Sequence, residues 1–168
     1  MDSVETYLKD VRETHDSGAA VPETSYYPAL RQLLNDAGQT LAPRVRCVVN
    51  LRNRGAGIPD GGLFSAEQFR GRAEDESAFG ALPSRGAIEV KPPGEDVNTI
   101  ADSVQVRRYL AEYGQVLVTN LREFLLVVTA DNGEPRPLEH YVIASNKREF
   151  WTAARTAKDG KRAGRTAA

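Results

Sequence analysis

The chain has 168 residues, of which 40% are hydrophobic and 27% charged, a composition ordinary for one soluble globular domain with its own core. Its net charge of −1 gives no global attraction to nucleic acid, so such a partner must be held by local basic patches. No apolar run is long enough for a membrane span or a signal peptide, and we expect a cytoplasmic protein.

The single cysteine, Cys47, excludes an internal disulfide and a multi-cysteine zinc site. It lies among valines, which favours a buried structural thiol.

The N-terminal part of the chain predicts two helices. Apolar residues recur at helical spacing over residues 2–14, which form either a packing helix or a lid. The second helix has Thr24 or Ser25 as its expected N-cap, a proline in its first turn and Gly38 at its end.

Three strands are expected next. A β-branched run of period two predicts the first at residues 45–51. Residues 58–64 predict the second, which carries Asp60 and is loosened by two glycines. Residues 65–84 lose periodicity and are expected to form a solvated excursion, and residues 86–91 predict the third strand, ended by two prolines.

The C-terminal part predicts a long helix over residues 96–113 and two buried strands at 116–119 and 124–128. A hairpin turn then leads to a weaker strand at 139–144 and a final helix at 147–156. This order predicts an α/β fold in which a central mixed β-sheet is flanked by helices.

The domain is expected to cover residues 1–156. Residues 157–168 are rich in glycine, alanine and basic side chains, which predicts a flexible tail or a linker to further domains.

One constellation carries chemistry. Side chains alternate faces along a strand, so Glu89 and Lys91 point the same way while Val90 packs on the other side. If Asp60 lies alongside, both carboxylates can hold Mg²⁺, with Mn²⁺ as a substitute, next to the lysine. The backbone carbonyl of Val90 is a plausible third metal ligand, and Glu23 is a candidate further acid.

Lys91 has two roles open to it. It can deprotonate an attacking water if its pKa is lowered, or stay charged and stabilise the transition state of phosphodiester hydrolysis. The competing interpretations are a turn aspartate at Asp60, a solvated strand face at Glu89 and Lys91, and a helix-start acid at Glu23.

These residues resemble the PD-(D/E)xK nucleases, through Pro59-Asp60, Glu89-Val90-Lys91 and a Q-x-x-x-Y element at residues 105–109. The resemblance implies a restriction-endonuclease-like fold in which the acids and the lysine bind Mg²⁺ and activate water. It also implies that a glutamine and a tyrosine face the substrate or steady the site. These catalytic roles fall on Asp60, Glu89, Lys91, Gln105 and Tyr109, although the last two residues are equally well read as a surface pair.

A narrower resemblance joins residues 57–61, 88–92 and 117–124 to the N-terminal nuclease portion of single-chain restriction-modification enzymes. It implies double-stranded DNA as partner, with methyltransferase and target-recognition domains elsewhere in a parent polypeptide. The chain has no Asn-Pro-Pro-Tyr-type methyltransferase element. Dimerisation is expected because cutting both strands commonly requires two active sites.

Several arginines could bind DNA phosphates, and the alternative is that they serve surface solubility. The favoured candidates are Arg52, Arg54, Arg107 and Arg108, and the further candidates are Arg44, Arg46 and Arg122.

The leading hypothesis is therefore a Mg²⁺-dependent DNA endonuclease that acts as the cleavage module of a restriction-modification system in phage defence. The second is a repair or recombination nuclease that acts on ends or branched DNA. The third is a non-catalytic DNA-binding or assembly module that keeps the fold.

Overall fold

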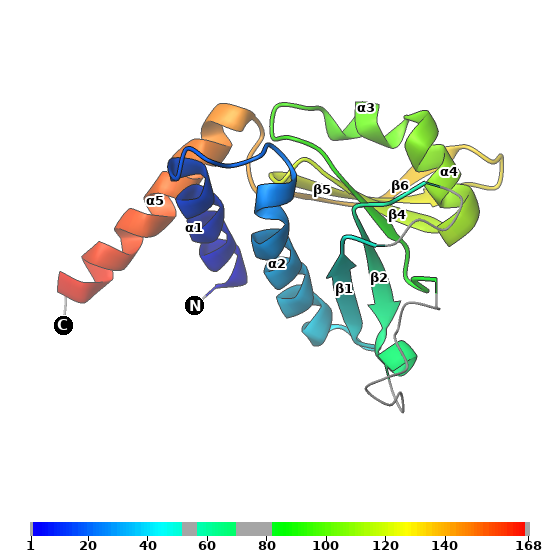
Figure 1. Cartoon of the computed structure of the whole chain (residues 1–168), viewed down its shortest axis with the longest axis horizontal. Helices are drawn as coiled ribbons and strands as arrows, with labels where there is room; N and C mark the ends of the chain where they lie inside the picture. Colours follow the sequence, from blue (N-terminus) through cyan, green and yellow to red (C-terminus); the bar gives the residue numbers. More distant parts are fainter. Residues whose placement is uncertain (1, 52–56, 70–81, 167–168) are drawn as a thin grey trace.

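A six-stranded mixed β-sheet forms the centre of the protein, and helices cover both of its faces (Figure 1). This computed structural model describes residues 2–51, 57–69 and 82–166. The elements are α1 (Ser3–Asp16), η1 (Thr24–Tyr26), α2 (Tyr27–Thr40), β1 (Val45–Val49), β2 (Gly61–Ser65), η2 (Ala66–Phe69), β3 (Ala87–Val90), α3 (Val97–Ala101), α4 (Val104–Tyr113), β4 (Gln115–Thr119), β5 (Glu123–Thr129), β6 (Pro135–Val142) and α5 (Lys147–Thr166).

The strands lie in the order β1-β2-β3-β4-β5-β6, with β3 and β4 parallel and every other neighbouring pair antiparallel. The predicted α/β class with a central mixed sheet flanked by helices is therefore confirmed. In the part of the chain that the structure describes, no helix combines the length and the apolar character that crossing a membrane requires.

Two hydrophobic clusters lie on opposite sides of the sheet. The larger one joins α1, α2 and α5 to Ile88 and Val90 of β3, and the smaller one joins α3 and α4 to Val116 and Val118 of β4. In Figure 1, α1 and α5 lie side by side, while α3 and α4 lie across the sheet from them. Residues of β3 thus alternate between the two clusters, as the period of a strand requires.

The parallel pair β3 and β4 is joined by the crossover that contains α3 and α4. The crossover returns the chain to the sheet beside β3, and the backbone N–H of Lys91 donates to the carbonyl of Thr119 at 2.8 Å. The end of β3 is thereby fixed next to the end of β4, and the beginning of α4 reaches β3 through the bond from Gln105 to Glu89. A motif on the strand and a motif on the helix can meet there.

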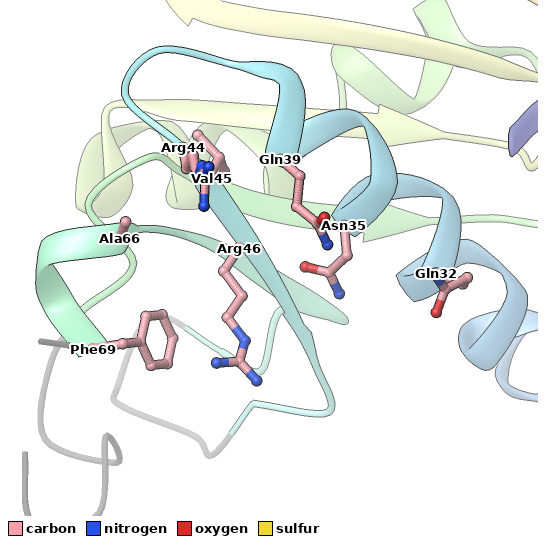
Figure 2. Close-up of a pocket in the computed structure, with 8 residues that line it drawn as sticks. All are labelled: Gln32, Asn35, Gln39, Arg44, Val45, Arg46, Ala66 and Phe69. Carbon is pink, nitrogen blue, oxygen red and sulfur yellow. The ribbon is translucent and has the colours of Figure 1, made fainter.

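Helix α2 covers the free edge of β1. The side-chain amide of Asn35 accepts from the Cys47 backbone N–H at 2.9 Å and donates to the Cys47 carbonyl at 3.3 Å, in place of a neighbouring strand. Figure 2 shows Asn35 and Gln39 of α2 next to Val45 of β1. Burial raises the pKa of the Cys47 thiol to about 12, consistent with the expected structural role.

Gly38 is not the end of the second helix, as the sequence predicted. It lies inside α2, where a Cβ atom would stand 2.2 Å from the backbone carbonyl oxygen of Val45. Close approach of helix and strand is therefore the reason for glycine. The expected cap at Thr24 or Ser25 is also wrong, because a turn of 3₁₀-helix precedes α2 and its N-cap is Tyr26.

The helix predicted over residues 96–113 is two helices. The Ser103 side chain accepts from the Val106 backbone N–H and caps α4, as the Asp96 side chain caps α3 by accepting from Thr99. Serine and aspartate satisfy the first backbone donors of a helix, so each begins a new one.

Three further elements begin or end at other residues than the sequence predicted. β2 begins at Gly61, so Asp60 precedes the strand that was expected to carry it, and β6 begins at Pro135 rather than at residue 139. The final helix continues to Thr166, so residues 157–166, expected to be flexible, are helical. Alanine, lysine and arginine favour the helix, and the two glycines do not outweigh them. Residues 167–168 lie outside the described ranges.

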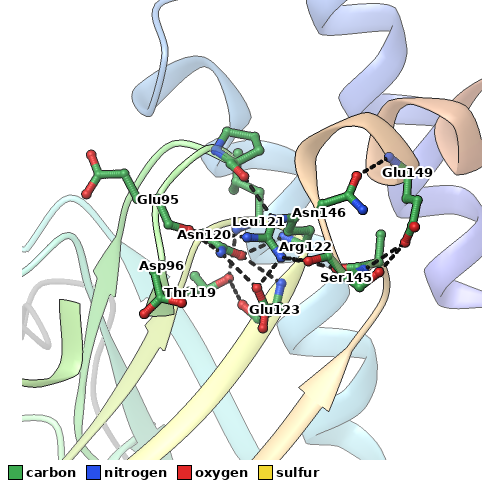
Figure 3. Close-up of polar contacts among 12 residues, drawn as sticks. Glu95, Asp96, Thr119, Asn120, Leu121, Arg122, Glu123, Ser145, Asn146 and Glu149 are labelled. Carbon is green, nitrogen blue, oxygen red and sulfur yellow. Dashed lines mark hydrogen bonds and ion pairs between the residues drawn. The ribbon is translucent and has the colours of Figure 1, made fainter. Parts of the chain in front are cut away.

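Arg122 is a buried junction between three segments, and its side chain is only 8% exposed. This arginine forms an ion pair with the neighbouring carboxylate of Glu123. It also donates to the carbonyls of Pro93 (2.8 Å), Ser145 (3.0 Å), Ala144 (3.2 Å) and Glu95 (3.4 Å) (Figure 3). These contacts tie the loop after β3 to the β4–β5 turn and the start of α5. The DNA-phosphate role considered for Arg122 is therefore wrong.

Replacing Arg122 by methionine keeps the length of the side chain but leaves several buried carbonyls without a donor. We expect Arg122→Met to lower the free energy of unfolding by about 3 kcal/mol or more, measured by urea denaturation. The matched control is Arg136→Met, because Arg136 is exposed on β6. Equal stabilities of the two variants would contradict the junction role.

Candidate active site

Glu89 is buried in the middle of the fold, with 2% of its side chain exposed. It lies on β3, whose four residues are all buried, and faces α4 rather than the cluster that holds Ile88 and Val90. Its Oε1 accepts from the Lys91 ammonium at 2.6 Å, and its Oε2 accepts from the Gln105 amide at 3.2 Å. Glu89 and Lys91 therefore lie on one side of the strand, as the Glu-x-Lys spacing predicted.

The Q-x-x-x-Y element faces this carboxylate. The Gln105 amide donates both to Glu89 and to the hydroxyl of Tyr109, the latter at 2.9 Å. Gln105 is exposed as a residue, whereas Tyr109 is buried at 1% exposure. The pair thus runs from the solvent to the buried carboxylate, which the surface-pair interpretation did not predict.

Asp60 contacts the same strand through the strand's backbone. Its Oδ2 accepts from the backbone N–H of Val90 at 2.7 Å, and its Oδ1 accepts from the hydroxyl of Tyr27 at 2.6 Å. The glycine after Asp60, Gly61, lets β2 lie close against β1, because a Cβ there would stand 2.8 Å from the carbonyl of Val48. Asp60 is thus more than a turn aspartate, since its carboxylate joins two segments far apart in the sequence.

Tyr27 is the residue of this site that the sequence interpretation missed. It is the first residue of α2 and is buried, and its hydroxyl holds Asp60. Burial raises the pKa of Tyr27, and so do the hydrogen bond to Asp60 and the charges of Asp60, Glu23 and Glu89. Tyr27 therefore stays protonated and acts as a donor. In the sequence, the only indication of this role was the position of Tyr27 at the start of a helix, four residues after Glu23.

Burial and charge act differently on the two partners of the ion pair. Burial raises the pKa of Glu89, and the bond from Lys91 opposes this shift without cancelling it. Burial lowers the pKa of Lys91, but the hydrogen bond and charge of Glu89 outweigh burial, so that its pKa lies above the ordinary value. Burial outweighs the ion pair at Glu89, whereas the ion pair outweighs burial at Lys91. The reason is the exposed fraction of each side chain, which is 2% for Glu89 and 28% for Lys91.

The donor set can be tested against Mg²⁺. Asp60 and Glu89 offer hard carboxylate oxygens that keep unused lone pairs, and Mg²⁺ needs only one or two protein carboxylates when waters and substrate complete its coordination. A buried carboxylate with a raised pKa also gains from a nearby cation. The residues therefore fit such an ion.

The further ligands are less well supplied. Among the described residues, no three histidine, cysteine, aspartate or glutamate side chains form a group that could hold a metal, so Glu23 is not joined to the two carboxylates. Its charge nevertheless raises the pKa of Glu89 and of Lys91. The Val90 carbonyl as a ligand stays a prediction.

The expected DNA-binding arginines divide into three cases. Arg52 and Arg54 lie outside the described residues. Arg107 is exposed and pairs with Glu134 at 2.6 Å, whereas Arg108 is exposed on α4. Neither Arg107 nor Arg108 forms a bond to Asp60, Glu89 or Lys91 in the described part of the chain, and the role of all four arginines on DNA stays a prediction.

Comparison with known proteins places the fold. No family model matches the sequence, and no curated protein matches it either. Among solved structures, the chain is similar to one described as a cryo-EM structure of a DrdV–DNA complex, with a TM-score of 0.51 and 18% sequence identity. The alignment covers 94% of this chain but only 13% of that one. At this identity the likeness concerns the fold alone, which is shared with one part of a much longer chain.

The raised pKa of Glu89 makes a prediction about stability and pH. The stability that this group contributes is fully present below its ordinary pKa of 4.5 and is lost as the pH rises through the folded-state value. Between pH 4.5 and neutrality, the wild-type protein should therefore lose stability relative to Glu89→Gln. Urea denaturation in EDTA across this range measures the difference.

Glu112→Gln is the matched control, because Glu112 is exposed on the same helix as Gln105. Its stability relative to the wild type should not change with pH in this way. A constant offset between the wild type and Glu89→Gln would contradict the raised pKa.

Proposed function

We propose that this chain is a Mg²⁺-dependent DNA endonuclease domain that cleaves phosphodiester bonds within a restriction-modification system. One observation carries the proposal: a buried Glu89 shares its hydrogen bonds between Lys91 and Gln105, while Asp60 is bonded to the adjacent backbone. Structural roles rarely require an acid, a second acid and a lysine to converge at the end of one strand. The fold likeness to a protein in complex with DNA supports DNA as the substrate.

The protein contributes position and charge. Asp60 and Glu89 would hold the metal ion, and Tyr27 fixes the orientation of the Asp60 carboxylate. Bound Mg²⁺ would supply stabilisation of the negative charge that grows on the phosphoryl oxygens. Gln105, which is exposed and bonded to Glu89, would contact the DNA and keep Glu89 aligned.

Of the two roles open to Lys91, the cation is favoured. Its pKa is raised, so the ammonium is charged at neutral pH and cannot take a proton from water. A fixed ammonium beside the scissile phosphate would stabilise the additional negative charge of the transition state. Glu89 thereby has two functions, as ligand and as the partner that keeps Lys91 charged.

The restriction-modification context rests on the resemblance of the sequence and on the length relation. A domain that corresponds to 13% of a longer chain is suited to work as a cleavage module beside recognition and methyltransferase domains. Dimerisation for double-strand cleavage is proposed on the same basis.

The activity test uses substitutions that keep the shape of the site. We expect Asp60→Asn, Glu89→Gln and Lys91→Ala each to lower the rate of Mg²⁺-dependent nicking of closed circular DNA by on the order of 10²-fold or more. Lys9→Ala and Glu112→Gln, which alter residues of the same types away from the site, should cleave like the wild type.

Cleavage by all three site variants at the wild-type rate would refute the site. A wild-type chain that cuts linear DNA but leaves closed circles intact would favour the end-directed nuclease. A chain that binds DNA and never cuts it would favour the non-catalytic module.

Metal binding can be measured without activity. Mg²⁺ at about 100 times its dissociation constant should stabilise the wild-type fold by about 2.7 kcal/mol, which thermal unfolding or calorimetry detects. Glu89→Gln and Asp60→Asn should lose most of this stabilisation because each removes a charged ligand, and Glu112→Gln should keep it. Equal stabilisation of all four proteins would place the metal elsewhere.

A further inference from the structure

A polar hollow lies between α2, β1 and η2. It has a volume of about 420 Å³, and Figure 2 shows the side chains that line it. The lining consists of Gln32, Asn35, Gln39, Arg44, Val45, Arg46, Ala66 and Phe69. We call this hollow the arginine groove.

Two arginines give the arginine groove its positive charge. Arg44 and Arg46 are both exposed, and neither forms an ion pair with any residue that the structure describes. Arg46 lies 4.9 Å from the centre of the Phe69 ring, a cation–π contact that holds the guanidinium in place. None of the described residues that line the groove is acidic. These features favour an anionic ligand.

The amides in the lining are largely occupied within the protein. Asn35 is bonded to the backbone of Cys47, and Gln32 donates to the carboxylate of Asp36 at 2.7 Å. Side-chain amides that are already bonded within the protein are not available to read base edges. Two exposed arginines beside them suit the recognition of phosphate groups instead.

Helix α2 relates the arginine groove to the candidate active site. Its first residue, Tyr27, holds Asp60, and Gln39 near its other end lines the groove. Twelve residues at about 1.5 Å each separate these positions by about 18 Å along the helix. The same phosphate cannot occupy both, but one duplex, with a turn of about 34 Å, can reach both.

We propose that the arginine groove binds the phosphodiester backbone of the DNA at a position away from the cut, through Arg44 and Arg46. This deepens the proposed function, on which it rests for the identity of the substrate. The groove contributes affinity and orientation but takes no part in the chemistry. It therefore acts on the binding of DNA and leaves the rate of the bound complex unchanged.

The experiment compares the wild type with the double variant Arg44→Ala/Arg46→Ala. Binding to a labelled duplex of about three helical turns is followed by fluorescence anisotropy in EDTA, from low to moderate salt. We expect the double variant to bind about 10-fold more weakly or worse. The slope of log K against log salt should fall by about 1.8, because each phosphate contact contributes about 0.9. The cleavage rate at saturating DNA should not change.

Two further variants separate the groove from general charge and from folding. Arg136→Ala/Arg148→Ala removes two exposed arginines elsewhere and should keep the wild-type slope. Arg44→Lys/Arg46→Lys keeps the charges and should recover most of the slope. An unchanged slope in the alanine double variant, or an equal loss in the control double variant, would overturn the proposal.

The outcome does not depend on whether the protein cuts DNA. If the wild type never cuts DNA but the alanine double variant shows the expected fall in salt slope, the nuclease proposal fails and the groove proposal stands. If the wild type does not bind duplex DNA, the groove proposal is overturned. Displacement of DNA by polyglutamate at equal charge, if it required Arg44 and Arg46, would assign the groove to an acidic protein segment and overturn the DNA assignment.

Discussion

The burial of one negative charge, that of Glu89, is the constraint on which the rest of the site depends. A carboxylate that is 2% exposed loses most of its hydration, and such a group is tolerated only where partners restore what water supplied. Here the partners are one ammonium and one amide, both from flexible side chains. These two partners do not fully replace the lost hydration of the carboxylate, since the pKa of Glu89 is raised. A carboxylate in this condition would gain from a nearby cation.

Arg122 shows the opposite condition. It is also a buried charge, yet its guanidinium is bonded to four backbone carbonyls and one carboxylate, so that its donors are satisfied by the protein itself. Two of these carbonyls belong to Pro93 and Glu95, which follow Lys91 closely in the chain. Arg122, whose donors are satisfied, therefore holds the segment that directly follows Glu89 and Lys91. Arg122 therefore stabilises the fold, whereas the buried charge of Glu89 lowers stability at neutral pH.

The sequence predicted what local periodicity determines. The alternation along β3 gave the shared face of Glu89 and Lys91, and the four-residue spacing gave the pair Gln105 and Tyr109. It could not predict contacts that depend on how elements pack. Tyr27 reaches Asp60 across 33 positions, and Gly38 looked like a helix end because nothing local records the carbonyl of Val45 beside it. The approach of Asp60 to Val90 was expected only through the family resemblance, for the same reason.

The position of α2 follows from both kinds of contact. At its N-terminus the Tyr27 hydroxyl fixes Asp60, and at its C-terminal half Asn35 and Gly38 bring it against the edge of β1. The helix thus cannot shift along the strand without breaking bonds at both ends. Any ligand held between α2 and β1 is therefore held at a fixed distance from the carboxylates. A rigid spacing of this kind is what a protein needs if contacts to the DNA backbone are to bind the duplex in one orientation relative to the carboxylates.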